Sequence, residues 1–220
     1  MRSPVRLGVI GSSGGGALIS ACACLKSAGK NIEWVVVTDR ECGLDAWAKI
    51  KATSSHRIEY RDANAFSEEA NKIFKDAGCE DVLLFYTRRV SAPLINQKRV
   101  SNIHPALLPA FRGLNGVKDA LSAGVKVIGA TLHHVDAGLD TGKIVAQVSA
   151  PLSHKMTLME AEHLSYLQKI WLTLVWFDRL ILPHVFVDMG AIGRAVVAAS
   201  PGIADDKLRA SYIDFIKSNE

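Results

Sequence analysis

The sequence predicts an α/β fold: an open, mostly parallel, Rossmann-like sheet of about seven strands with helices on both faces. Three observations support this prediction. Short apolar runs alternate with longer amphipathic stretches, which is the order of repeated βαβ units. A glycine cluster follows the first apolar run and leads into a helical pattern, as at a tight strand-to-helix turn. The length of 220 residues suits one such domain with its own core.

The positions of the apolar runs define the expected sheet. Strands are predicted over residues 6–10, 32–37, 57–60, 81–86, 99–103, 126–134 and 144–149. The amphipathic stretches between them predict helices over residues 16–28, 46–53, 67–77, 92–96 and 117–123, the third of them capped from within 64–67. One loop separates the last two strands, so we expect them to form an antiparallel extension of the sheet.

A long helix is predicted over residues 156–182, with Thr157 as its N-cap and Pro183 closing or kinking it. Its apolar face carries Leu164, Leu167, Trp171, Leu174 and Val175. An apolar patch of Val185, Val187, Val196 and Val197 and an amphipathic piece over 207–217 follow. We therefore expect one main domain over residues 1–183 and a helical C-terminal extension over 184–220 that packs on it.

Composition favours a cytoplasmic protein. The net charge of +4 is modest and the basic residues are scattered, so no nucleic-acid platform is expected. No apolar run reaches the ~20 residues that span a bilayer, and the N-terminus enters a strand instead of a signal peptide. The cysteines show neither a Cys-x-x-Cys pair nor a disulfide scaffold, which predicts reduced thiols and no metal site; they are Cys22, Cys24, Cys42 and Cys79.

Three polar residues in the segment 101–142 have complementary chemistry. Asn102 and His104 lie two residues apart at the end of an apolar run, so both point to one side of a strand and can act on one atom. An amide and an imidazolium can donate hydrogen bonds to an oxyanion, and the carboxylate of Asp140, paired with the imidazole, can relay protons. Each residue alone would be explained as a cap or a loop residue, but the spaced set favours catalysis at a carbonyl carbon.

The segment 82–147 resembles the folate-dependent formyltransferase family. The family pattern Asn-x-His-Pro-x-Leu-Leu-Pro matches the run that begins at Asn102, and His-x-Val-x-x-x-x-Asp-x-Gly matches residues 133–142. The resemblance is strongest to the branch that formylates glycinamide ribonucleotide in purine biosynthesis, and weaker to the formyltransferase that acts on methionyl-tRNA and to the deformylase. It implies the formyltransferase fold, with the catalytic domain over 1–183.

This resemblance assigns the catalytic roles to Asn102, His104 and Asp140. It implies 10-formyltetrahydrofolate as the formyl-donating cosubstrate, a small phosphorylated amine as acceptor, and no metal. His133 stands at the family's histidine position, where it either steers Asp140 or only packs.

Two binding segments are also implied. The folate is expected to contact Arg88, Arg89, Val90, Val135, Asp136 and Asp140. The glycine cluster can cradle the phosphate of the acceptor through backbone amides at a helix N-terminus, although a tight turn alone would also explain it. Its residues are Gly11, Ser12, Ser13, Gly14 and Gly15.

Three positions depart from the family pattern. Glycines at 15–16 replace a Ser-Asn pair at the end of the phosphate loop, and Phe-Tyr at 85–86 replaces a small Ala-Gly pair in the wall of the pteridine pocket. Tyr166 falls where the family's Glu holds the amine of the acceptor. Glu162, one turn earlier, could restore that contact if the helix is shifted, or it could be a solvated surface residue.

These departures leave the acceptor open. One alternative is formyl transfer to another amine, such as an amino sugar nucleotide. A second is hydrolysis of 10-formyltetrahydrofolate, although the resemblance to the deformylase implies an additional N-terminal domain for which we expect no room. A third is a folate-binding protein without activity, against which the intact set of Asn102, His104 and Asp140 argues.

Overall fold

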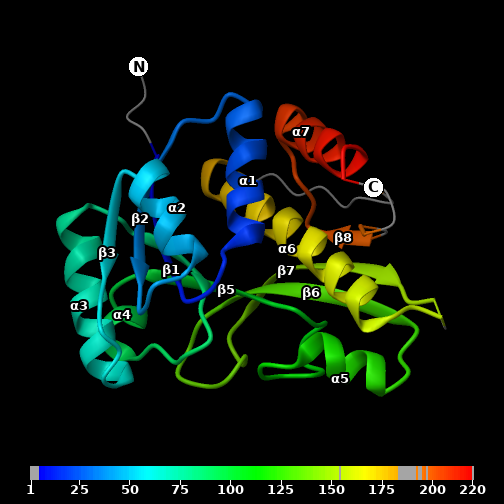
Figure 1. The fold of residues 1–220 in the computed structure, drawn as a ribbon, viewed down its shortest axis with the longest axis horizontal. Coiled ribbons are helices and arrows are strands. Elements are labelled where there is room, and N and C mark those ends of the chain that lie inside the picture. Colours follow the sequence, from blue (N-terminus) through cyan, green and yellow to red (C-terminus); the bar gives the residue numbers. More distant parts are fainter. Residues whose placement is uncertain (1–4, 154, 183–191, 193–194, 197, 220) are drawn as a thin grey trace.

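An eight-stranded sheet with the order β3-β2-β1-β4-β5-β6-β7-β8 forms the centre of the computed structural model (Figure 1). The structure describes all residues except 1–4, 154, 183–191, 193–194, 197 and 220. The strands are β1 (Val5–Gly11), β2 (Ile32–Thr38), β3 (Ser54–Arg57), β4 (Asp81–Phe85), β5 (Arg99–His104), β6 (Val127–His134), β7 (Ile144–Pro151) and β8 (Ala198–Ser200).

The pairing of the strands changes direction at β5. Every pair from β3 to β5 is parallel, whereas β5–β6, β6–β7 and β7–β8 are antiparallel. The prediction of an open, mostly parallel sheet with an antiparallel extension is therefore confirmed. The extension is one strand longer than expected, because the three residues of β8 pair with β7.

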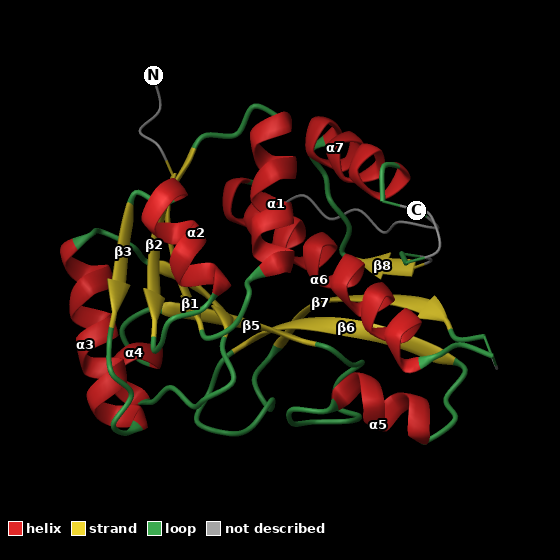
Figure 2. Ribbon diagram, viewed as in Figure 1, coloured by secondary structure: helices red, strands yellow, loops and turns green. Residues whose placement is uncertain are grey.

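Helices cover both faces of the sheet (Figure 2). They are α1 (Gly16–Ser27), α2 (Gly43–Lys51), α3 (Ala63–Asp76), α4 (Ala92–Ile95), α5 (Gly116–Ser122), α6 (Leu158–Ile181) and α7 (Asp206–Lys217). The side chains of β2 alternate between two cores. Trp34 and Val36 pack in the cluster that includes α1 and α6, while Val35 and Val37 pack in the cluster that includes α3 and α4.

Three elements begin three or more residues away from their expected positions. Strand β3 covers Ser54–Arg57 rather than 57–60, because this short polar edge strand is held by its pairing with Val35–Thr38 and carries no apolar pattern. Helix α3 begins at Ala63 rather than 67, since the Asp62 carboxylate caps it by accepting from two backbone N–H groups. Helix α2 begins at Gly43 rather than 46.

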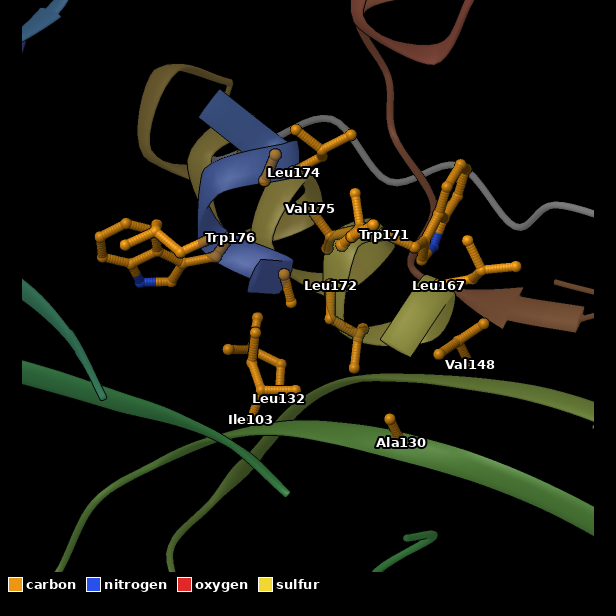
Figure 3. Close-up of a cluster of buried hydrophobic side chains, with 14 of the residues drawn as sticks. Ile103, Ala130, Leu132, Val148, Leu167, Trp171, Leu172, Leu174, Val175 and Trp176 are labelled. Atoms are coloured by element: carbon orange, nitrogen blue, oxygen red, sulfur yellow. The ribbon is translucent and has the colours of Figure 1, made fainter. Parts of the chain in front are cut away.

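The long helix α6 follows the expected pattern. The Thr157 hydroxyl accepts the backbone N–H of Glu160 at 3.3 Å, and the Glu160 carboxylate accepts that of Thr157 at 2.8 Å, which completes a capping box. The helix is buried along most of its length, and Figure 3 shows its side chains packed above Ile103 and Leu132 of the sheet. No helix in the described part of the chain has the length and apolar character to cross a membrane.

Most of the expected apolar patch lies outside the described residues, namely Val185, Val187 and Val197, as does Pro183. Val196 is described and fully buried. Helix α7 contacts α1 and α6, and the Tyr212 hydroxyl donates to the Leu167 carbonyl at 3.1 Å. The described part of the segment 184–220 thus contributes a strand as well as a helix.

Replacement of Trp171 by alanine should lower the free energy of unfolding by about 3–5 kcal/mol. The Trp171 side chain is 0% exposed and its ring lies 5.0 Å from that of Tyr212, so truncation leaves a cavity between α6 and α7. Urea unfolding monitored by circular dichroism measures the change. Met159 on the same helix is 76% exposed, and Met159→Ala serves as the control with little expected loss. Equal stabilities of the two variants would contradict this account of the core.

Candidate active site

The antiparallel register of β5 and β6 brings the predicted catalytic side chains together. Asn102 pairs with His133, and His104 pairs with Thr131. Asn102 and His104 lie two residues apart on β5, and both line the same cavity. Asp140 comes from the loop that follows β6 and reaches the same place.

The carboxylate of Asp140 lies between the two histidines. Its Oδ2 atom accepts the backbone N–H of Gly113 at 2.9 Å and lies 3.4 Å from Nδ1 of His104. Its Oδ1 atom lies 3.6 Å from Nε2 of His133. The structure therefore joins Asn102, His104, His133 and Asp140 in one constellation.

The hydrogen bonds of His133 determine its tautomer. Nδ1 lies 2.9 Å from the His134 carbonyl oxygen, which can only accept, so Nδ1 carries the proton. Nε2 of the neutral ring can then accept from the Asn102 amide nitrogen at 3.3 Å. Burial lowers the pKa of His133 below 6.5, and its hydrogen bond to His134 and the charge of Asp140 only partly oppose this. The neutral ring thereby orients the amide of Asn102.

His104 has acceptors on both sides of its ring. Nε2 lies 2.7 Å from the Phe111 carbonyl oxygen and therefore carries a proton, while Nδ1 faces the Asp140 carboxylate. This arrangement suits the imidazolium form, which can donate from both nitrogens. The side chain is only 2% exposed, so its charge would act in a poorly screened environment.

Buried polar contacts fix the loop after His104. The Thr131 hydroxyl donates to the Ala106 carbonyl at 2.7 Å and accepts the Leu108 N–H at 3.0 Å. Gln147 donates to the Leu108 carbonyl at 3.0 Å. Neither Thr131 nor Gln147 stands out in the sequence, because their role depends on the β6–β7 pairing, which sets them opposite each other.

The backbone of the loop that carries Asp140 is restricted at two positions. Asp140 has a φ of 52°, in the left-handed region, and a Cβ atom at Gly142 would lie 1.8 Å from the His134 carbonyl oxygen. The Asp136 carboxylate accepts from the Gly138 N–H at 3.0 Å and from the Thr141 hydroxyl at 2.7 Å. Asp136, for which the sequence predicts a folate contact, lines the cavity, and its side chain also stabilises this loop.

The predicted folate residues all line the cavity, but they differ in how they are held. Nε of Arg88 lies 3.0 Å from an Asp39 carboxylate oxygen, and its guanidinium lies 4.5 Å from the centre of the Tyr60 ring. Arg89 is exposed, and the Val90 and Val135 side chains pack against the core cluster that includes α3. Val90 and Val135 therefore supply an apolar wall.

The bulky pair at 85–86 does not close this wall. The ring of Tyr86 stacks on Phe66 with centroids 5.1 Å apart, and Phe85 packs against the other core cluster. Both residues still line the cavity, whose volume is about 320 Å³. Pockets of roughly this size accommodate small organic ligands.

Only part of the predicted phosphate loop faces this cavity. Ser13 lines it, whereas Gly11, Ser12, Gly14 and Gly15 do not. Ser12 is buried, with its hydroxyl 3.0 Å from that of Thr87, and Gly15 has a φ of 67° at the N-cap of α1. This loop is therefore tied to the segment that follows β4.

Tyr166, at the family's Glu position, lies beside this loop. A Cβ atom at Gly16 would be 3.5 Å from Cε2 of Tyr166, and the Tyr166 hydroxyl lies 2.7 Å from that of Ser20. Two departures from the family pattern thus lie close to each other. Glu162 is exposed and does not line the cavity, so the helix shift that would bring it into the site is not seen.

Lys169 is a cavity residue that the sequence motifs do not include. The sequence did contain a signal for it, because Lys169 is the one charged residue between Leu164 and Phe177 of a largely apolar helix.

The described residues contain no group of three or more His, Cys, Asp or Glu side chains that could hold a metal ion.

Known proteins share both the sequence pattern and this fold. The model of the formyl transferase family matches residues 7–169. Phosphoribosylglycinamide formyltransferase from Mycobacterium tuberculosis is 65% identical over 54 residues, which cover 24% of this chain and 25% of that protein. Mitochondrial formyltetrahydrofolate deformylase 2 from Arabidopsis thaliana is 40% identical over 107 residues, 48% of this chain and 32% of that protein. The matched segments thus span only about a quarter to a third of these two relatives.

A solved structure matches along most of its length. The crystal structure of glycinamide ribonucleotide transformylase 1 from Symbiobacterium toebii superposes with a TM-score of 0.75 at 28% identity. The match covers 90% of this chain and 95% of that one.

His133 should be neutral and protonated on Nδ1 near pH 6.5, because burial lowers its pKa below the ordinary value of 6.5. Long-range ¹H–¹⁵N correlation spectra of the imidazole rings report both properties. As pH falls below about 6.5, the unfolded chain binds a proton that folded His133 does not, so this residue's contribution to stability declines. A ring protonated on Nε2 in this pH range would contradict the assigned hydrogen bonds.

Proposed function

This chain belongs to the formyl transferase family, and on that premise we propose that it transfers a formyl group from 10-formyltetrahydrofolate to a primary amine, with glycinamide ribonucleotide as the acceptor in purine biosynthesis. One observation carries the proposal: Asn102, His104 and Asp140 meet at one cavity, with His133 orienting the first of them.

The first task of the site is to stabilise an oxyanion. When an amine attacks the formyl carbon, the carbonyl oxygen gains negative charge. The hydrogen bond to His133 uses one N–H of the Asn102 amide, and the second N–H can donate to this oxygen. The imidazolium of His104 adds positive charge close by, and Asp140 balances that charge in the resting site.

The second task is proton transfer. The attacking nitrogen must lose a proton, and the departing folate nitrogen must gain one. The Asp140 carboxylate lies at this cavity beside His104 and His133, and the backbone N–H of Gly113 sets its position. We assign to it the uptake of the proton from the amine and its relay to the folate nitrogen.

The folate itself is proposed to lie between the Arg88–Val90 segment and the loop from Val135 to Asp140. This place is at the carboxyl ends of the parallel strands, where open α/β folds bind ligands. The apolar side chains of Val90 and Val135 suit a flat pteridine ring, and stacking of Tyr86 on Phe66 leaves space for it.

Two alternatives have a specific observation in their favour. The match to a deformylase favours water as the acceptor of the formyl group. The absence of a carboxylate at Tyr166 favours an amine other than glycinamide ribonucleotide, such as an amino sugar nucleotide. Incubation of the protein and 10-formyltetrahydrofolate with a panel of amines, and with none, separates these possibilities by the product formed.

The substitutions His104→Ala and Asp140→Asn should each lower kcat by about 10²- to 10⁴-fold while leaving folate binding nearly unchanged, because both groups act mainly in the transition state. Turnover is measured by the release of tetrahydrofolate, and binding by thermal protection with 5-formyltetrahydrofolate. His56→Ala on the edge strand β3 is the control. If either active-site variant keeps wild-type kcat, the role given to that residue is wrong.

The Kd of glycinamide ribonucleotide should be about 10- to 100-fold higher than it would be with a carboxylate at position 166. The missing charged hydrogen bond to the amine is worth about 1.5–3 kcal/mol. Calorimetric titration of the wild type, Tyr166→Glu and the uncharged control Tyr166→Gln tests this, and only the Glu variant should gain affinity. Saturation at micromolar concentration with rapid formylation by the wild type would show that another contact replaces the missing carboxylate. Absence of binding at millimolar concentration would show that the acceptor is another amine.

A further inference from the structure

The segment 111–113, in the loop between β5 and α5, contacts both His104 and Asp140. Nε2–H of His104 donates to the Phe111 carbonyl at 2.7 Å. The Gly113 N–H donates to Oδ2 of Asp140 at 2.9 Å, and the same oxygen lies 3.4 Å from Nδ1 of His104. The two side chains and this short segment therefore form a closed ring of contacts.

Both contact residues of the segment have backbone conformations that L side chains rarely adopt. Phe111 has a φ of 52° and Gly113 has a φ of 98°. A bulky residue in the left-handed region is uncommon and costs conformational free energy, so it persists where the surrounding contacts require it. At Phe111 this conformation sets the direction of the carbonyl group that accepts from His104, and at Gly113 it directs the N–H toward Asp140.

Glycine is needed at position 113 for its conformation and not for space. A Cβ atom at Gly113 would have nothing within 4 Å, but its backbone would still have to adopt the φ of 98°. Gly116 at the start of α5 is the opposite case, because a Cβ atom there would lie 3.3 Å from Nε2 of His104. The first turn of α5 thus packs closely against the edge of the ring that donates to Phe111.

The loop that contains this segment is held at both ends. On its N-terminal side, the Leu108 backbone is hydrogen-bonded to Thr131 of β6 and to Gln147 of β7. On its C-terminal side, α5 contacts β6 and α6. A backbone change at position 111 or 113 must therefore be taken up between these two anchors, where it moves the groups that hold His104 and Asp140.

We infer that Phe111 and Gly113 are positioning residues, whose left-handed backbone holds the His104 ring and the Asp140 carboxylate in the arrangement needed for catalysis. This inference rests on the proposed function, because that function gives His104 and Asp140 their roles. The Phe111 carbonyl fixes the rotation of the ring so that Nδ1 faces Asp140, and the Gly113 N–H keeps Oδ2 in place. Groups held in this way need no rearrangement as charge develops, so loss of a holding contact lowers the rate and not the binding of substrates.

Replacement of Gly113 by alanine tests the backbone requirement without a steric clash. Gly113→Ala should lower kcat about 10- to 100-fold and leave both KM values nearly unchanged, because it disturbs the charged hydrogen bond to Asp140. Gly124→Ala is the matched control: Gly124 has a φ of 67°, a Cβ atom there would also meet nothing within 4 Å, and it does not line the cavity. This control should lose stability but keep wild-type kcat. Equal kcat values of the two variants would overturn the role of Gly113.

Two substitutions of Phe111 separate the backbone of this residue from its ring. Valine is strained in the left-handed region and asparagine adopts it more readily, while both lack the aromatic ring. Phe111→Val should lower kcat about 10- to 100-fold, whereas Phe111→Asn should retain most of it. Equal losses in the two variants would show that the ring is needed and would overturn the role given to the backbone. If Phe111→Val does not fold, the comparison of Gly113→Ala with Gly124→Ala decides.

Spectra of the imidazole rings give a readout that needs no turnover. In ¹H–¹⁵N correlation spectra, the Nε2 proton of His104 should exchange with water about 10-fold faster in Phe111→Val than in the wild type or Phe111→Asn, because its hydrogen bond to the carbonyl is lost. If the wild type formylates no amine while this difference is seen, the proposed reaction fails and the positioning of His104 stands. If the wild type is active, Phe111→Val must show both the faster exchange and the lower kcat, and the absence of either overturns the inference.

Discussion

The register between β5 and β6 is the constraint on which the site depends. It sets Asn102 opposite His133, so that a neutral imidazole can orient the amide. A slip of one residue would turn every side chain of one strand to the other face of the sheet and separate this pair. Because β6 runs antiparallel to β5, the loop that follows β6 lies beside the end of β5, and this places Asp140 next to His104.

Burial makes the polar groups of the site depend on one another. His104 and His133 are almost fully enclosed, and each of their ring nitrogens has a partner at a stated distance. Removal of one partner leaves a buried polar group unpaired, and this destabilises the folded protein by more than the hydrogen bond had stabilised it. The polar groups of the site therefore depend on one another. The apolar layer below it, formed where α6 packs over Ile103 and Leu132, gives this set a rigid base (Figure 3).

Much of the fold could be predicted from the sequence, because buried parallel strands such as β1 and β2 leave apolar runs. The polar edge strand β3 carries no such run, and its place is decided by pairing with β2. The two motifs identified Asn102, His104 and Asp140, since their spacing reflects the local backbone. Thr131 and Gln147 could not be found in this way, because their hydrogen bonds join elements that meet only in the folded chain. The division at residue 183 stays a prediction.

The closeness of position 16 to the ring of Tyr166 has a consequence for how the acceptor site can change over evolutionary time. A Cβ atom at position 16 would lie 3.5 Å from Cε2 of Tyr166, which is an ordinary van der Waals distance, so alanine fits beside the ring. A longer side chain at position 16 must adopt a rotamer that points away from this ring. The side chains that position 16 accepts therefore depend on the residue at position 166.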